Sequence, residues 1–138
     1  MPSPFRSLQH LASAVSSCAA CTRLWRSLLL GLIVAVSYLA LAPIPPPSVD
    51  LGWDKLNHVA AFAALTISAL LGFPASRINQ GKLLFLLLAY GGLIEVLQLF
   101  VPGRACEWTD LIADTLGIAG GALIAGLLAR WATSKRTR

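Results

Sequence analysis

Four long apolar stretches with short connections constrain this chain more than any other feature of its sequence. They span residues 25–42, 54–73, 82–101 and 108–129. Each has the length that a helix needs to cross a hydrocarbon core of about 30 Å, which is about 17–25 residues. Long apolar runs without alternation exclude membrane strands. We therefore predict an all-α fold, a polytopic bundle of four transmembrane helices in which neighbours are antiparallel because their connections are short.

Proline marks the ends of the first three stretches, at Pro43, Pro74 and Pro102. Proline cannot continue a helix because it lacks the N–H donor. We accordingly divide the chain into an N-terminal arm (1–24), a four-helix membrane domain (25–130) and a basic tail (131–138).

The composition excludes an ordinary soluble enzyme. Of the 138 residues, 57% are hydrophobic and 12% are charged, whereas soluble domains carry about 25% charged residues. Because so few charges cannot cover the surface of a domain of this size, lipid must contact much of that surface.

The charges divide between the two ends of the predicted helices. One end carries nine basic residues and no acid, whereas the other carries two basic residues, Lys55 and Arg104, and all six acids. Lys and Arg concentrate in cytoplasmic loops, so we expect both termini to be cytoplasmic and the acidic end to face outward. The nine basic residues are Arg6, Arg23, Arg26, Arg77, Lys82, Arg130, Lys135, Arg136 and Arg138.

Polar side chains near the acidic end repeat at helical spacing. Ionisable groups inside membrane segments are costly and usually face protein or a wet cavity. We therefore expect three helices to direct their polar faces into one outward-opening pocket. Its candidate catalytic residues are His58, Glu95 and Asp114, as general acids or bases. Its candidate ligand-binding residues are Asp54, Lys55, Gln98, Arg104 and Asp110.

Each of these residues also has a purely structural interpretation. His58 and Glu95 could each form a buried hydrogen-bonded pair with a neighbouring polar side chain. Arg104 could neutralise neighbouring acids rather than bind a phosphate or carboxylate. Asp110 could stabilise a helix N-terminus. We expect Gly117 and Gly121 to let another helix approach closely.

No cofactor or metal is predicted. His58, Glu95 and Asp114 would suit a hard cation or Zn²⁺, but no spacing requires one. Cys18 and Cys21 lack the second pair that a zinc site needs.

Three motifs in this order and spacing resemble the VanZ-like family of small integral membrane proteins. They are Asp54-Lys55-x-x-His58-x-x-x-Phe62, Glu95-x-x-Gln98-x-x-x-Pro102-Gly103-Arg104 and Asp110-x-x-x-Asp114-x-x-Gly117. The chain departs from the family pattern at Asp114, where Asn is usual, and at Glu107, where a small polar residue is common. The resemblance implies a bacterial cytoplasmic (inner) membrane protein of the cell envelope and a link to teicoplanin resistance; most members have no assigned reaction.

Two functions remain open from the sequence. The first is an enzyme or binder for the headgroup of a membrane lipid or of a phosphorylated, lipid-linked cell-wall intermediate. The second is a non-catalytic membrane protein that acts by association, with the polar residues fastening its helices. A channel is disfavoured because the inner half of the spans is almost free of polar residues. We expect no nucleic-acid partner, because the basic residues flank spans in short groups as lipid anchors do.

Overall fold

A computed structural model describes residues 19–43, 54–73, 79–104 and 106–134. Within these ranges it contains four helices and no strand: α2 (Ala19–Leu41), α3 (Asp54–Gly72), α4 (Gln80–Gln98) and α5 (Trp108–Ser134). All four are long and apolar enough to cross a membrane. The predicted all-α, four-helix membrane fold is thus confirmed.

The helix ends differ from the predicted ones by a few residues. Helix α2 begins at Ala19 rather than Trp25, and α5 continues to Ser134 rather than Ala129. The predicted arm and tail otherwise fall on residues 1–18 and 135–138, outside the described part of the chain. Residues 19–24 include Ala and Leu and contain no proline or glycine, so helix α2 extends toward the N-terminus beyond Trp25.

Helix α4 is shifted toward its N-terminus because polar side chains and a turn define its ends. It starts at Gln80 because Asn79 caps it, its side chain accepting a hydrogen bond from the Gly81 N–H at 2.9 Å. It ends at Gln98, three residues before the predicted Val101. A turn follows in which the Arg104 N–H donates to the Val101 carbonyl at 3.1 Å. Gly103 occupies that turn with φ of 81°, a backbone conformation that favours glycine.

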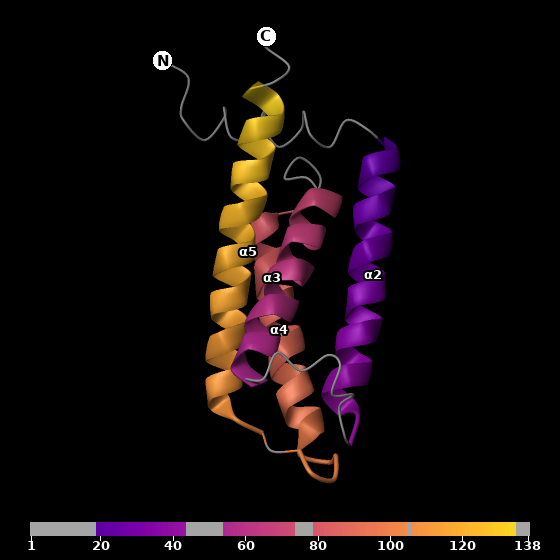
Figure 1. Ribbon diagram of the computed structural model, residues 1–138, viewed down its shortest axis with the longest axis vertical. Helices are drawn as coiled ribbons and strands as arrows, with labels where there is room; N and C mark the ends of the chain where they lie inside the picture. The colour runs from indigo at the N-terminus through magenta and orange to yellow at the C-terminus, as the bar shows by residue number, and fades with distance from the viewer. Residues whose placement is uncertain (1–18, 44–53, 74–78, 105, 135–138) are drawn as a thin grey trace.

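The helices run alternately up and down, with α3 in contact with each of the other three (Figure 1). The most extensive packing is between α3 and α5, which run side by side. Because chain direction alternates, the acidic ends of α3, α4 and α5 meet at one end of the bundle.

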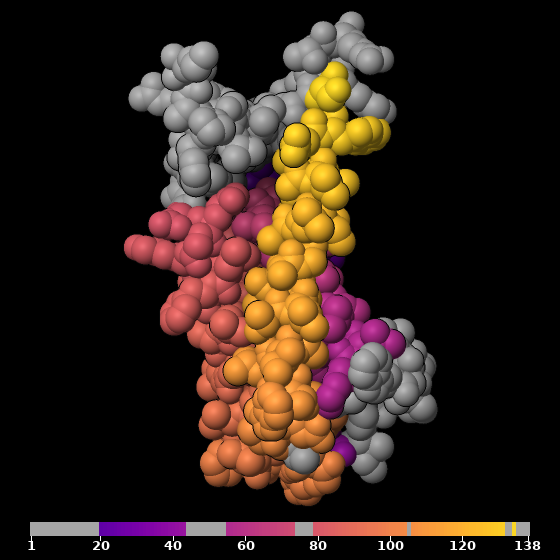
Figure 2. All heavy atoms as spheres, turned by 90° about the vertical axis from the view of Figure 1, so that its left-hand side faces the viewer, coloured from indigo at the N-terminus to yellow at the C-terminus, as the bar shows by residue number. Residues whose placement is uncertain are grey.

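Large apolar side chains cover the outside of the bundle. Figure 2 shows α5 along one face, and Leu116, Leu123 and Trp131 of this helix are each more than 60% exposed. Helices α2 and α4 expose Leu and Phe side chains in the same way. Such a surface is unfavourable in water and suits lipid contact.

The interior holds a small apolar core and a few polar ties between helices. Phe62 and Leu65 of α3 are at most 2% exposed and pack with Leu29 and Leu87. The Tyr90 hydroxyl donates to the Ile33 carbonyl at 3.1 Å and joins the Ser37 hydroxyl at 2.8 Å, which links α4 to α2.

At the opposite end of the bundle from the acids, Arg26 links α2 to the end of α3. Its Nε donates to the Gly72 carbonyl at 2.9 Å, and its guanidinium lies 4.6 Å from the centre of the Phe73 ring. Carbonyls at a helix C-terminus lack partners within the helix, so a cation there is favourable.

Candidate functional site

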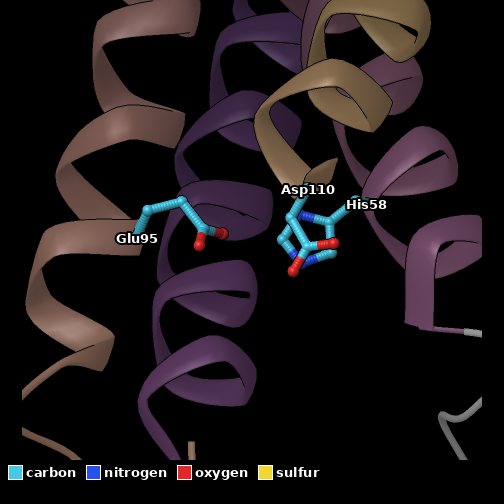
Figure 3. A group of neighbouring side chains, drawn as sticks. All are labelled: His58, Glu95 and Asp110. Carbon is cyan, nitrogen blue, oxygen red and sulfur yellow. The ribbon is translucent and has the colours of Figure 1, made fainter. Parts of the chain in front are cut away.

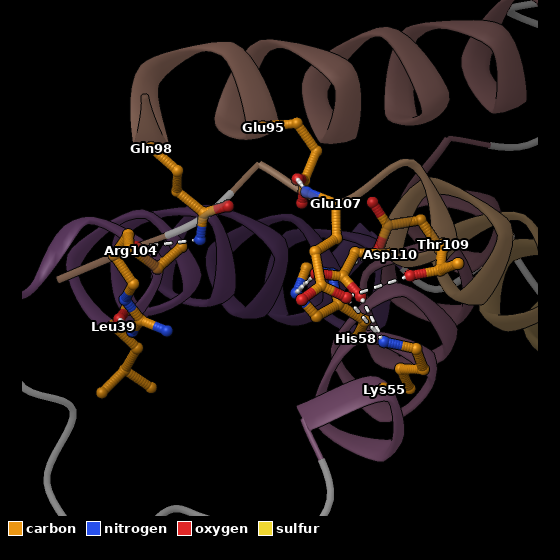
Figure 4. A network of polar contacts seen from close by, with 11 residues as sticks. Leu39, Lys55, His58, Glu95, Gln98, Arg104, Glu107, Thr109 and Asp110 are labelled. Atoms are coloured by element: carbon orange, nitrogen blue, oxygen red, sulfur yellow. Dashed lines mark hydrogen bonds and ion pairs between the residues drawn. The ribbon is translucent and has the colours of Figure 1, made fainter. Parts of the chain in front are cut away.

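Six ionisable side chains from α3, α4, α5 and the residues before α5 meet near one end of the bundle (Figure 4). We call them the polar cluster: Lys55, His58, Glu95, Glu107, Asp110 and Asp114. Five of them were predicted site residues, brought together here from segments up to 59 positions apart in the sequence, since 114 − 55 = 59. Asp54 is the first residue of α3, and its side chain lies outside the described part of the chain.

The imidazole of His58 lies between two aspartates of α5. Its Nδ1 is 2.8 Å from Asp114 Oδ1, and its Nε2 is 3.8 Å from Asp110 Oδ2. Asp114 is 1% exposed and Asp110 3%. Since a carboxylate can only accept, the Nδ1 contact favours the ring form that carries its proton on Nδ1. Nε2 lies on the Asp110 side.

Glu95 approaches this pair from α4, with its carboxylate directed toward His58 and Asp110 (Figure 3). Its Oε2 accepts a hydrogen bond from the Glu107 backbone N–H at 3.1 Å. One ligand atom from each of Glu95, His58 and Asp110 lies within 4.8 Å of the others. Glu95 is three residues from the end of α4, so it lies about 4.5 Å inside that end.

Three buried oxygens in this region have no hydrogen-bond partner among the described residues. They are Glu95 Oε1, Gln98 Oε1 and Asp114 Oδ2. An unpaired buried polar atom costs about 1–3 kcal/mol. These atoms are therefore the places where a ligand, an ion or a proton would be stabilised.

Lys55 connects the start of α3 to the start of α5. Its ammonium lies 3.0 Å from Glu107 Oε2 and 3.4 Å from Asp110 Oδ1. The hydrogen bond from Lys55, assisted by one from Thr109, lowers the pKa of the Glu107 carboxyl. This carboxylate therefore stays ionised to a lower pH than an ordinary glutamate.

Glu107 was noted in the sequence only as a departure from the family pattern, and its contribution to the site was missed. Its backbone N–H holds Glu95 while its side chain holds Lys55. The adjacent Cys106 is exposed, and desolvation followed by the nearby charge of Glu95 raises the pKa of its thiol. A raised pKa keeps the thiol protonated and disfavours it as a nucleophile.

Arg104 and the amide nitrogen of Gln98 bond to the end of α2, to one side of the polar cluster (Figure 4). The Gln98 Nε2 donates to the Ala40 carbonyl at 3.1 Å. Arg104 donates to the carbonyls of Leu39 at 2.8 Å and Ala42 at 3.2 Å. The described contacts therefore include no ion pair between Arg104 and the acids, which was the structural alternative considered from the sequence. The turn at Gly103 is the sequence signal that could have indicated this direction.

Glycines give α3 and α5 room to approach. A Cβ on Gly117 would lie 2.5 Å from the Val59 carbonyl oxygen, and one on Gly121 would lie 2.6 Å from that of Ala63. In α4, a Cβ on Gly91 would meet the Asp114 carboxylate and the Phe62 ring. The small residues thus set the helix spacing that brings His58 to Asp114.

The fold and the cluster define a multi-pass membrane protein of the all-helical class, with an ionisable site near one end of its spans. The chain belongs to the VanZ/LLP1 family, whose model matches residues 4–129. The family expected from the three motifs is thereby confirmed. Neither the comparison with curated proteins nor the comparison with solved structures found a match.

Proposed function

We propose that this protein binds the polar headgroup of a lipid, or of a lipid-linked cell-wall intermediate, at the outer leaflet of the bacterial cytoplasmic membrane. The observation that carries the proposal is the set of buried, unpartnered oxygens on Glu95, Gln98 and Asp114. All three are hydrogen-bond acceptors. They favour a headgroup that supplies donors, such as sugar hydroxyls or an ammonium group.

The depth of the cluster supports a ligand at the membrane interface. Lys55 and Asp110 lie in the first turns of α3 and α5, and Glu95 in the last turn of α4. A lipid whose acyl chains lie against the exposed apolar faces of the helices would hold its headgroup at this level. The charge distribution of the sequence favours an outward orientation for this end.

The charges of the cluster refine the kind of headgroup. Four carboxylates accompany one ammonium group, that of Lys55, which already contacts Glu107 and Asp110. Arg104 contacts the end of α2. A bare phosphate therefore has few cations to meet here, and the phosphate of a lipid would lie outside the carboxylates while its sugar or amine enters. Altered access to such intermediates is how the protein would affect sensitivity to a glycopeptide such as teicoplanin.

Native mass spectrometry of the purified protein tests this proposal. We expect the wild type to retain a polar lipid that the double variant His58→Ala, Glu95→Gln releases, because the variant loses the imidazole of His58 and the negative charge of Glu95. Lys82→Gln, which changes a charge at the opposite end of α4, should retain it. Equal retention by the wild type and a folded double variant would contradict the proposal.

A second function is favoured by the direct bonds between helices within the cluster. Lys55 and His58 of α3 contact α5 through Asp110 and Asp114, as groups that only fasten helices would. If that is their whole role, the double variant lowers the unfolding temperature in detergent strongly and the retained lipids do not change. The protein would then act by association within the envelope.

A further inference from the structure

We propose that His58, Glu95 and Asp110 form a binding site for one divalent metal ion, with Zn²⁺ as the best fit. No metal was predicted from the sequence. The inference goes beyond headgroup binding, because an ion can occupy this site whether or not a lipid does. It rests on four features of the polar cluster.

The first feature is the convergence of three ligand types from three helices. One ligand atom of each residue lies within 4.8 Å of the others, and Figure 3 shows the three side chains facing one another. Around a tetrahedral zinc ion with ligand distances of about 2.0–2.2 Å, ligand atoms are about 3.4 Å apart. His58 Nε2 and Asp110 Oδ2 are already 3.8 Å apart. Rotation of the flexible Glu95 side chain can bring its carboxylate to the remaining ligand distance from the ion.

The second feature is an unpartnered ligand atom. Glu95 is 5% exposed, and its Oε1 has no hydrogen-bond partner among the described residues. Its other oxygen is held by the Glu107 N–H. The hydrogen bond to Oε2 thus orients the carboxylate, and Oε1 can bind an ion.

The third feature is the support behind the ligands. Metal-binding histidines usually donate their second ring nitrogen to a carboxylate, which fixes the ring and strengthens it as a ligand. Asp114 lies in that position, 2.8 Å from His58 Nδ1. Asp110 has a similar support, because Lys55 lies 3.4 Å from its Oδ1. Asp114 is therefore a positioning residue rather than a ligand.

The fourth feature is charge. Four carboxylates surround one ammonium group in the cluster, and a divalent cation offsets the excess negative charge. The imidazole selects a metal such as Zn²⁺ over Ca²⁺ or Mg²⁺, which prefer oxygen ligands. Three protein ligands leave a fourth position for water or a ligand atom, as in catalytic zinc sites.

Zn²⁺ titration of the purified full chain tests the inference. The protein used for this titration has the substitutions Cys18→Ser, Cys21→Ser and Cys106→Ser and no histidine tag, so that neither thiols nor a tag can bind the ion. After EDTA treatment and removal of the EDTA, we expect calorimetry and elemental analysis to give one Zn²⁺ per chain, and Mg²⁺ not to compete.

Matched variants assign the ligands. We expect Glu95→Gln and Asp110→Asn to weaken Zn²⁺ binding by at least about tenfold and Asp114→Asn by about 10–100-fold, the range for groups that orient a ligand. Lys82→Gln changes a charge at the opposite end of α4, away from the polar cluster, and should stay within about threefold of the wild type. Co²⁺ absorption spectra should change with the ligand variants and not with Lys82→Gln.

Several results would overturn the inference: no Zn²⁺ bound by the wild type, binding that survives both ligand variants, or an equal loss in Lys82→Gln. The wild-type result holds even if a variant fails to fold. Polar lipid retained by a protein that binds no Zn²⁺ overturns the metal site alone. Zn²⁺ bound without any retained lipid overturns headgroup binding alone.

Discussion

At the scale of single residues, neighbouring side chains decide what each polar group can do. His58 and Arg104 both lie near the same end of the bundle, yet His58 contacts two aspartates and Arg104 contacts main-chain carbonyls. The difference follows from direction: His58 projects from α3 toward α5, whereas the turn at Gly103 directs Arg104 back to α2.

The adjacent glycines of α4 give a residue-scale prediction. Gly91→Ala places a methyl group against the Asp114 carboxylate and the Phe62 ring, so it should lower the free energy of unfolding by about 1–3 kcal/mol. Gly92→Ala is the matched control, because a Cβ there meets nothing within 4 Å. Thermal unfolding in detergent measures both, and equal effects would show that Gly91 is not closely packed.

At the scale of helices, close backbone approach and polar bonds act together between α3 and α5. Without a hydrophobic driving force between helices in lipid, packing at small residues and interhelical hydrogen bonds hold them together. Gly117 and Gly121 provide the close approach, and the His58 contact to Asp114 lies one turn from Gly117.

This pairing predicts that Gly117→Ala separates α3 from α5. The new methyl group would lie 2.5 Å from the Val59 carbonyl oxygen, so the helices must shift. We expect a loss of about 1–3 kcal/mol in the free energy of unfolding, together with weaker Zn²⁺ binding. Gly120→Ala, where a Cβ meets nothing within 4 Å, should leave both close to wild type. A Gly117→Ala protein with unchanged stability would contradict the packing described here.

Arg104 gives a second prediction at this scale, because it donates hydrogen bonds to carbonyl groups at the end of α2. Arg104→Met removes its bonds to the Leu39 and Ala42 carbonyls, and charge-assisted bonds of this kind contribute about 1.5–3 kcal/mol each. We expect faster hydrogen exchange in the last turn of α2 and a lower unfolding temperature, partly restored in Arg104→Lys. Loss of lipid retention without a change in stability would instead assign Arg104 to the ligand, as the sequence suggested.

At the scale of the whole molecule, the helix directions separate two chemically different ends. Because the helices alternate in direction, Arg23 and Arg26 of α2, Lys82 of α4 and Arg130 of α5 lie near one end of the bundle and the polar cluster lies near the other. The distribution of Lys and Arg predicts an orientation with the basic end in the cytoplasm.

Thiol labelling in intact cells tests this orientation. A variant that keeps Cys106 and has serine at Cys18 and Cys21 should react with a membrane-impermeant maleimide, because Cys106 is exposed near the end that is predicted to face outward. Labelling needs mildly alkaline pH, since the pKa of this thiol is raised. Ser134→Cys in a Cys106→Ser background should react only after the cells are opened. The reverse pattern would place the polar cluster on the cytoplasmic side.

The sequence by itself determined the four spans, the fold class, the family and most members of the polar cluster. Those features depend on local properties: the length of apolar runs, the positions of proline and the spacing of polar residues along a helix. Only the tertiary structure decided which polar groups meet. His58 pairs with Asp114, Glu107 holds both Glu95 and Lys55, and Gln98 and Arg104 bind the end of α2. Helix rotation, the spacing set by Gly117 and the turn at Gly103 control those partnerships, because side-chain contacts between segments depend on three-dimensional placement and not on distance along the chain.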